Sequence, residues 1–151
     1  MIGLLQRVIH AQVDVHGACV GRIDSGLLAF IGIRRADDAH SALRLLERIL
    51  NYRVFADEQG RMNRSLSDTG GGLLLVPQFT LTADTRKGNR PGFSTAAAPE
   101  LAQPLFAELL RAAQAIHPAV AAGVFGAEMQ VSLVNDGPVT FWLESSPPAS
   151  E

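Results

Sequence analysis

The sequence contains a single cysteine, no long apolar run and no excess of basic residues. Cys19 cannot form an intramolecular disulfide, which fits a reducing cytosol. No run of about 18 apolar residues occurs, so we expect no membrane-spanning helix. The first residues also lack the basic segment and apolar core of a signal peptide. With a formal net charge of −2, the chain does not have the large basic face that coats a nucleic-acid duplex, although local contact with one end of an RNA stays open.

The length of 151 residues fits one domain. We assign residues 1–144 to this domain and expect residues 145–151, which are polar and contain proline, to form a disordered tail. Hydrophobic spacing predicts strands over 4–15, 18–23, 27–33, 73–76, 129–134 and 139–143. It predicts one helix over about 38–52 and a second that begins near Leu101 and ends at His117. Segments 65–72 and 83–99 are expected to be loops. This order indicates an α+β fold with a sheet-rich, barrel-like core and two amphipathic helices packed outside it.

Asn135-Asp136-Gly137-Pro138 separates the last two apolar segments. Asn-Asp-Gly is typical of a hairpin turn, so we expect the chain to reverse here. A proline at the start of the returning strand is unexpected, because it removes one hydrogen-bond donor from the ladder. Two interpretations are open. The proline either stiffens an ordinary turn, or a Gly137-Pro138 peptide in the cis form presents two carbonyls as a rigid pair of acceptors.

Familiar catalytic patterns do not account for the chain. The four histidines are scattered and none has a zinc-site spacing. No nucleophile elbow occurs, and the glycine run 70–72 lacks the Lys-Ser/Thr of a phosphate-binding loop. Cys19 is expected to be a packed core thiol rather than a reactive one. Thr80, taken alone, fits a strand residue better than a nucleophile, and the basic loop 86–94 is either solvated or bound to RNA.

Several segments together resemble the D-aminoacyl-tRNA deacylase family. The most specific are Gln78-Phe79-Thr80-Leu81 and the run Val-Asn-Asp-Gly-Pro-Val-Thr-Phe-Trp-Leu at 134–143. The remaining matches extend the resemblance over nearly the whole chain; they are Met1-Ile2, Gln6-Arg7-Val8, Gly26-Leu27-Leu28, Arg53-Val54-Phe55, Met62-Asn63, Ala83-Asp84-Thr85, Gly88-Asn89-Arg90-Pro91 and Phe125-Gly126-Ala127-Glu128-Met129.

The resemblance implies a homodimeric, cytoplasmic enzyme of translation quality control. Such an enzyme hydrolyses the ester between a D-amino acid, or mischarged glycine, and the 3′-terminal adenosine of tRNA, and it spares L-aminoacyl-tRNA. Its partners would be aminoacyl-tRNA and a second copy of the chain. It would need no cofactor, no metal and no membrane.

The resemblance also assigns roles to individual residues. Gly137-Pro138 corresponds to the family's Gly-cis-Pro element, which enters the partner subunit's active site and excludes an L side chain by its carbonyl oxygens. Arg7 and Asn135 belong to the same group of substrate-binding and chirality-rejecting residues. Gln78, Phe79 and Thr80 match the catalytic motif, in which a backbone amide of Phe79 or Thr80 would stabilise the oxyanion and the ribose 2′-hydroxyl would position or activate water. The RNA-binding candidates are Arg86, Lys87 and Arg90.

Two departures keep alternatives open. Pro77 stands where the family usually has serine before Gln-Phe-Thr, and Gly92 replaces the serine of Arg-Pro-Ser-Phe. Gly92 would loosen its loop, and a chain with both changes could be a non-catalytic binder of tRNA 3′ ends. A general esterase with Thr80 as covalent nucleophile is a further alternative, but it needs an activating base, and none lies nearby in the sequence.

Overall fold

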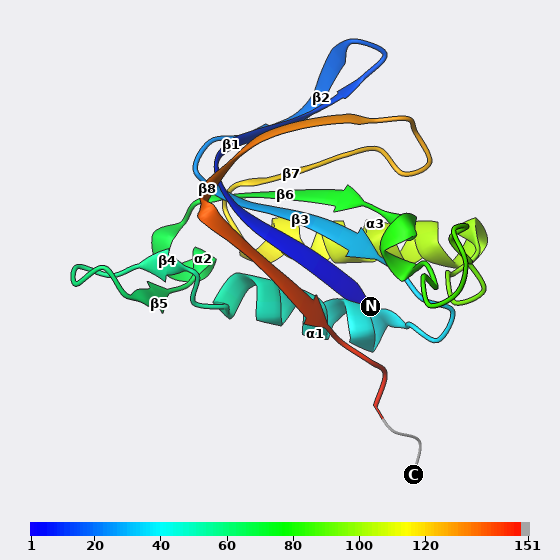
Figure 1. Cartoon of the computed structure of the whole chain (residues 1–151). Helices are drawn as coiled ribbons and strands as arrows, with labels where there is room; N and C mark the ends of the chain where they lie inside the picture. Colours follow the sequence, from blue (N-terminus) through cyan, green and yellow to red (C-terminus); the bar gives the residue numbers. More distant parts are fainter. Residues whose placement is uncertain (149–151) are drawn as a thin grey trace.

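The computed structural model describes residues 1–148, and Figure 1 shows a strongly curved sheet with two long helices beneath it. The strands are β1 (Ile2–Val15), β2 (Ala18–Ile23), β3 (Gly26–Gly32), β4 (Phe55–Ala56), β5 (Met62–Arg64), β6 (Gly72–Pro77), β7 (Val120–Ala122) and β8 (Gln130–Glu144). The helices are α1 (Ala39–Asn51), α2 (Leu66–Thr69), the 3-10 helix η1 (Phe79–Thr82) and α3 (Pro99–Ile116). None of the helices in 1–148 has the length and apolar character to cross a membrane.

The sheet is organised around β1. One edge of β1 pairs with β2 and β3, and the other edge pairs with β8, all antiparallel. β6 and β7 then extend the sheet from β3 by parallel pairing. Gly21 of β2 approaches β7 so closely that a Cβ there would lie 2.5 Å from the Ala122 carbonyl oxygen. The sheet therefore curls into a nearly closed barrel, as the pattern of apolar segments predicted.

The core has two parts, which explains the continuous apolar run of β3. Leu27, Ala29 and Ile31 belong to the larger cluster, which includes the buried faces of α1 and α3. Leu28, between them, belongs to a smaller cluster inside the curved sheet, with members from β1, β6 and β2. Because β3 is buried on both faces, its sequence is apolar at every position rather than at alternate ones.

The local sequence signals predicted the two long helices, but the short helix α2 was missed. Helix α1 begins at the N-cap Asp38, whose side chain accepts from the Ser41 amide, and α3 ends at the C-cap His117. Segment 65–72, expected to be a loop, contains α2. Ser65 and Asp68 form a reciprocal capping box there, and Gly70 closes the helix in the left-handed region; capping at both ends stabilises even a single helical turn.

The expected chain reversal at Asn135-Asp136-Gly137-Pro138 is wrong. Residues 130–144 form the one strand β8, and both halves pair with β1, from Ile2↔Glu144 through Val8↔Asn135 to Asp14↔Gln130. The register shifts between Gln6 and His10, so residues 136–139 leave the ladder as a bulge. The turn residues mark an interruption within the strand and not its end. Because β1 is long, β8 can continue to pair with it beyond the interruption.

Two further expectations differ from the structure. Cys19 is exposed, not packed in the core, because it lies near the tip of the β1–β2 hairpin, where the first three residues of β2 are all exposed. Ser145, assigned to the tail, is buried; its amide donates to the Met1 carbonyl and its hydroxyl donates to the Ser41 carbonyl. Residues 149–151 of the expected tail lie outside the described part of the chain.

Candidate functional site

The bulge in β8 presents Gly137 and Pro138 on the surface. Both residues are exposed, and the peptide bond between them is cis. Gly137 has a φ of +131°, and a Cβ at this position would lie 2.7 Å from Val139 Cγ2 and 3.2 Å from Arg7 Nη2. Glycine is thus required here by both its backbone conformation and its surroundings.

Arg7 and Asn135 hold the two sides of this bulge. The Arg7 guanidinium donates to the Asp136 carbonyl at 3.1 Å and to the Val54 carbonyl at 2.7 Å, and it lies 3.4 Å from the Asp136 carboxylate. The side-chain amide of Asn135 donates to the carbonyls of Arg7 at 2.9 Å and Val139 at 3.0 Å. Arg7 therefore bonds the carbonyl that precedes Gly137, and Asn135 closes the neck of the bulge. The contact to Val54 was missed, because no sequence pattern indicates that a backbone carbonyl accepts from a distant side chain.

Gln78, Phe79 and Thr80 form the turn that follows β6. The Gln78 amide donates to the Ile31 carbonyl at 2.8 Å, and the Gln78 side chain hydrogen-bonds the Thr80 hydroxyl. The first hydrogen bond of η1 is donated by the Leu81 amide to the Gln78 carbonyl. The amides of Phe79 and Thr80 thus precede the first bond of a helical turn, where N–H groups are available to a ligand.

Pro77 lies at the end of the sheet pairing of β6. Along β6, the Leu73 amide and the Leu75 carbonyl bond to the β7 side, whereas the Gln78 amide bonds to β3. Residue 77 therefore faces the end of β7, just beyond the bond that the Gly123 amide donates to the Leu75 carbonyl. Because Pro77 is the last residue of β6, its missing N–H affects only the end of the ladder.

Phe79 has an aromatic partner that the sequence did not reveal. Its ring lies 5.1 Å from that of Phe93, and both side chains are exposed although large and apolar, with Phe79 exposed by 60%. Thr95 donates to the Thr82 carbonyl at 2.6 Å, which ties the far arm of the loop to η1. An aromatic residue in an otherwise polar loop is the signal that could have identified Phe93.

The bulge and the Gln78–Thr80 turn lie level with opposite ends of β6 within one chain. Val8 pairs with both Asn135 and Gly26, and Gly26 pairs with Gly72, so the bulge is level with the start of β6. Gln78 follows the other end of that strand (Figure 1). At a rise of about 3.3 Å per residue, the two features are about 20 Å apart along the sheet.

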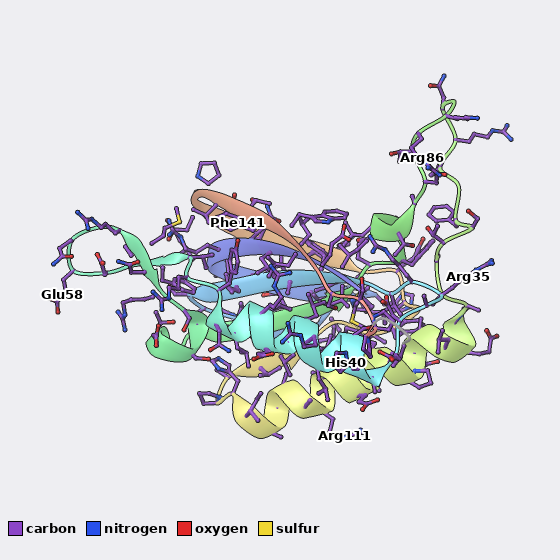
Figure 2. All side chains as sticks on the ribbon, turned by 90° about the horizontal axis from the view of Figure 1, so that it is seen from below. Arg35, His40, Glu58, Arg86, Arg111 and Phe141 are labelled. Atoms are coloured by element: carbon purple, nitrogen blue, oxygen red, sulfur yellow. The ribbon has the colours of Figure 1, made fainter. Side chains whose placement is uncertain are left out.

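The basic residues of the loop 83–98 lie beyond η1. Figure 2 shows this loop, with Arg86, projecting from one end of the molecule, while Glu58 marks the hairpin of β4 and β5 at the other. Arg86, Lys87 and Arg90 line a common cavity of about 460 Å³ with Asp84, Gly92 and Ser94. Within the described residues, no three His, Cys, Asp or Glu side chains gather as metal ligands would.

Comparisons with known proteins agree on one family. Residues 4–144 match the family model described as D-Tyr-tRNA(Tyr) deacylase. The D-aminoacyl-tRNA deacylase of Thioalkalivibrio sulfidiphilus is 64% identical over 98% of this chain and 99% of its own.

Two solved structures share the fold. The c-Myc DNA Unwinding Element Binding Protein superposes with a TM-score of 0.92 at 37% identity, covering 97% of this chain and 100% of its own. A probable eukaryotic D-amino acid tRNA deacylase superposes with a TM-score of 0.80 at 17% identity, over 95% and 98% of the two chains, and this match speaks for the fold alone. The resemblance found in the sequence is confirmed: the chain belongs to the D-Tyr-tRNA(Tyr) deacylase family.

Proposed function

We propose that this protein is a D-aminoacyl-tRNA deacylase that works as a cytoplasmic homodimer in translation proofreading. It hydrolyses the ester between a D-amino acid, or mischarged glycine, and the 3′-terminal adenosine of tRNA. The observation that carries the proposal is the family match over residues 4–144, which includes both the Gln78-Phe79-Thr80 turn and the exposed Gly137-Pro138 bulge.

The bulge selects the D configuration because it excludes an L side chain. Main-chain oxygens of Gly137 and Pro138 face the substrate Cα, where an L side chain would collide with them, whereas a D side chain points away and glycine has none. Arg7 and Asn135 support this role, because together they bond the backbone on both sides of Gly137. A site of this kind needs no side-chain pocket, so it accepts many D-amino acids and does not reject glycine.

The chemistry uses main-chain donors and the substrate itself. Water attacks the ester carbonyl carbon, and the amide of Phe79 or Thr80 donates to the oxyanion that forms. Collapse of this intermediate breaks the bond to the ribose O3′, which takes up a proton, and releases the free amino acid. The neighbouring 2′-hydroxyl positions or activates the water.

The active site is composed of two copies of the chain. A single chain holds the bulge and the turn about 20 Å apart along its sheet, which is too far for both to contact one aminoacyl ester. A two-fold dimer brings the bulge of one copy to the turn of the other, twice. Exposed apolar side chains on β1 and β8, among them Ile9, Val134 and Trp142, are compatible with contact between copies.

The direct test compares hydrolysis of D-tyrosyl-tRNA, glycyl-tRNA and L-tyrosyl-tRNA. We expect turnover of the first two and protection of the third. Equal rates on the D and L substrates, or no turnover of either, would contradict the proposal. Binding and protection of aminoacyl-tRNA without turnover would instead identify a non-catalytic binder of tRNA 3′ ends.

The role of the amides is tested at Phe79. Phe79→Pro removes an amide hydrogen at the first position of η1, where proline is tolerated because that hydrogen has no partner within the helix. Phe79→Ala is the matched control, since it shortens the side chain and keeps the amide. We expect a loss of about 100-fold or more in kcat for Phe79→Pro relative to Phe79→Ala. Near-normal turnover by Thr80→Ala would exclude Thr80 as a covalent nucleophile, and equal kcat for the two Phe79 variants would assign the oxyanion to another donor.

The two-copy site is tested with mixed dimers of Phe79→Pro and Pro138→Trp, purified through two different tags. Each variant alone should be inactive, because both sites of its dimer carry a lesion. In the mixed dimer one site carries both lesions and the other carries none, so about half of the wild-type activity should return. A mixed dimer as inactive as its parents would place both features in the same chain.

A further inference from the structure

The loop that carries the basic residues is closed at its neck. Asp84 and Gly92 pair by two backbone hydrogen bonds, of 2.7 and 3.0 Å. Gly88, at the tip, has a φ of +67°, a left-handed conformation typical of a tight turn. The loop is thus a small hairpin-like projection with a defined shape. Gly92, which we expect to loosen it, takes part in both backbone hydrogen bonds of its neck through its own main chain.

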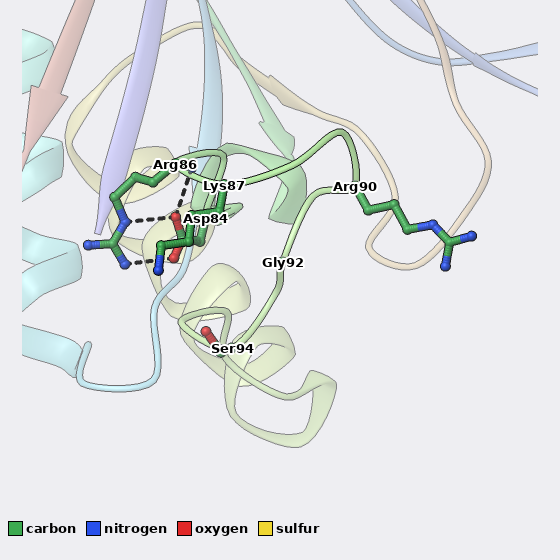
Figure 3. A pocket seen from close by; sticks show the side chains of 6 residues that line it. All are labelled: Asp84, Arg86, Lys87, Arg90, Gly92 and Ser94. Atoms are coloured by element: carbon green, nitrogen blue, oxygen red, sulfur yellow. Dashed lines mark hydrogen bonds and ion pairs between the residues drawn. The ribbon is translucent and has the colours of Figure 1, made fainter.

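Arg86 is neutralised inside this loop. Its guanidinium donates to both carboxylate oxygens of Asp84, at 2.8 and 2.6 Å, in the paired geometry that carboxylate and guanidinium prefer (Figure 3). The hydrogen bond from Arg86 holds the pKa of Asp84 well below its ordinary value, so the pair stays ionised throughout the physiological range. The positive charge of Arg86 is therefore matched locally.

Lys87 and Arg90 are not matched in this way. Within residues 1–148 neither side chain forms an ion pair, and both are exposed. Arg90 points away from the Asp84–Arg86 pair, to the opposite side of the loop (Figure 3). The net positive charge of the loop therefore comes from these two residues.

The far arm of the loop is also attached beside the Gln78–Thr80 turn. Phe93, on its far arm, packs on Phe79, and Thr95 bonds to η1 through the Thr82 carbonyl. A nucleic-acid strand whose 3′ end reaches the turn along this loop would pass close to Lys87 and Arg90. Backbone phosphates of a single-stranded end are the negative groups that such a strand offers there.

We infer that Lys87 and Arg90 contact the phosphates of the tRNA 3′ end, whereas Arg86 shapes the loop through Asp84 and makes no phosphate contact. This division of roles rests on the proposed function only for the identity of the RNA. It separates three neighbouring cations that the sequence could only treat as a group. The Ser94 hydroxyl, which lines the same cavity, is a further hydrogen-bond donor to a phosphate there.

The test is the salt dependence of binding of uncharged tRNA. The slope of log Kobs against log salt reports the number of phosphates neutralised, at about 0.7 for each in a single strand and about 0.9 in a duplex. For Lys87→Gln/Arg90→Gln we expect the slope to decrease in magnitude by about 1.4 to 1.8. For Asp84→Asn/Arg86→Gln, which leaves the net charge unchanged, we expect the wild-type slope, because the two backbone hydrogen bonds of the neck remain.

A second control removes the same charge elsewhere. Arg61→Gln/Arg111→Gln changes two exposed residues outside the loop: Arg61 comes from the segment between β4 and β5, and Arg111 lies on α3 (Figure 2). This variant should keep the wild-type slope. The inference is overturned if Lys87→Gln/Arg90→Gln keeps the wild-type slope, or if either control lowers it as much. Binding is measured without turnover, so this outcome is independent of the D against L assay, which alone decides the proposed activity.

Discussion

Asn135 should determine how firmly the Gly137-Pro138 bulge is held. One side-chain amide group donates to carbonyls on two strands, Arg7 on β1 and Val139 on β8. Asn135→Asp keeps the shape of the side chain but replaces the donor by an oxygen. Both hydrogen bonds are lost, and a negative oxygen then faces two carbonyl oxygens.

The expected magnitude follows from the number of bonds. A hydrogen bond of this kind contributes about 0.5–1.5 kcal/mol net, so the two together stabilise the closed bulge by about 1–3 kcal/mol. We expect Asn135→Asp to lower the free energy of unfolding in urea by that amount. If the bulge rejects L substrates, its loosening should also raise hydrolysis of L-tyrosyl-tRNA relative to D-tyrosyl-tRNA, a ratio that a purely structural role would leave unchanged.

Ser132→Asp is the matched control. It introduces the same charge at an exposed position of β8, outside the bulge. This control should retain both the stability and the D against L ratio of the wild type. If Asn135→Asp behaves like Ser132→Asp in both measurements, Asn135 does not hold the bulge. If stability falls but the ratio stays constant, Asn135 supports the fold and not the selectivity.

Three further predictions concern other parts of the chain. Asp37 pairs with the buried amino group of Met1, so Asp37→Asn should cost about 3–5 kcal/mol of unfolding free energy in urea, because a buried charge loses its partner. Gly137→Ala should destabilise the protein, because the new Cβ would lie 2.7 Å from Val139 Cγ2. Gly92→Ala should stabilise the protein by about 0.4–1 kcal/mol, because its Cβ would meet no atom closer than 3.7 Å. Equal shifts of the two variants in thermal unfolding would contradict this prediction. Hydrogen bonds from Arg34 and then Trp142 lower the pKa of Glu144, so its stabilisation is complete above its ordinary pKa and is lost as the pH falls through the lowered value. The difference in urea midpoint between wild type and Glu144→Gln should therefore be constant near pH 7 and shrink below about pH 4.5.

The spacing of apolar residues predicted the helices and strands whose buried faces can be identified from their own sequence. The apolar spacing of Leu45, Leu46 and Ile49 defines the buried face of α1, and the uninterrupted run 27–33 matches a strand covered on both faces. Cys19 shows where this inference fails. Its apolar neighbourhood suggested burial, but it lies near the tip of the β1–β2 hairpin, where it is exposed.

The residues of the candidate site could be predicted from the sequence, but their arrangement in space could not. Motif resemblance identified Gln78–Thr80 and Gly137-Pro138, but their separation by the length of β6 depends on the pairing of Val8 with both Gly26 and Asn135. The Arg7 contacts depend in the same way on Val54, which precedes β4 and lies far away in the chain. Such relations arise from sheet register, and no local pattern encodes them.

The difference between a hairpin and a bulge bears on the proposed rejection of L substrates. A hairpin tip is anchored on one side and can move as a unit, so it could yield to an L side chain. The bulge interrupts a strand that pairs with β1 both before and after it, at Val8↔Asn135 and at Gln6↔Thr140, and Arg7 and Asn135 add bonds across its neck. Exclusion by main-chain atoms works only if those atoms hold their positions against the substrate. Because both ends of the bulge pair with the same long strand, the feature that looked unsuitable for a turn suits the proposed steric gate.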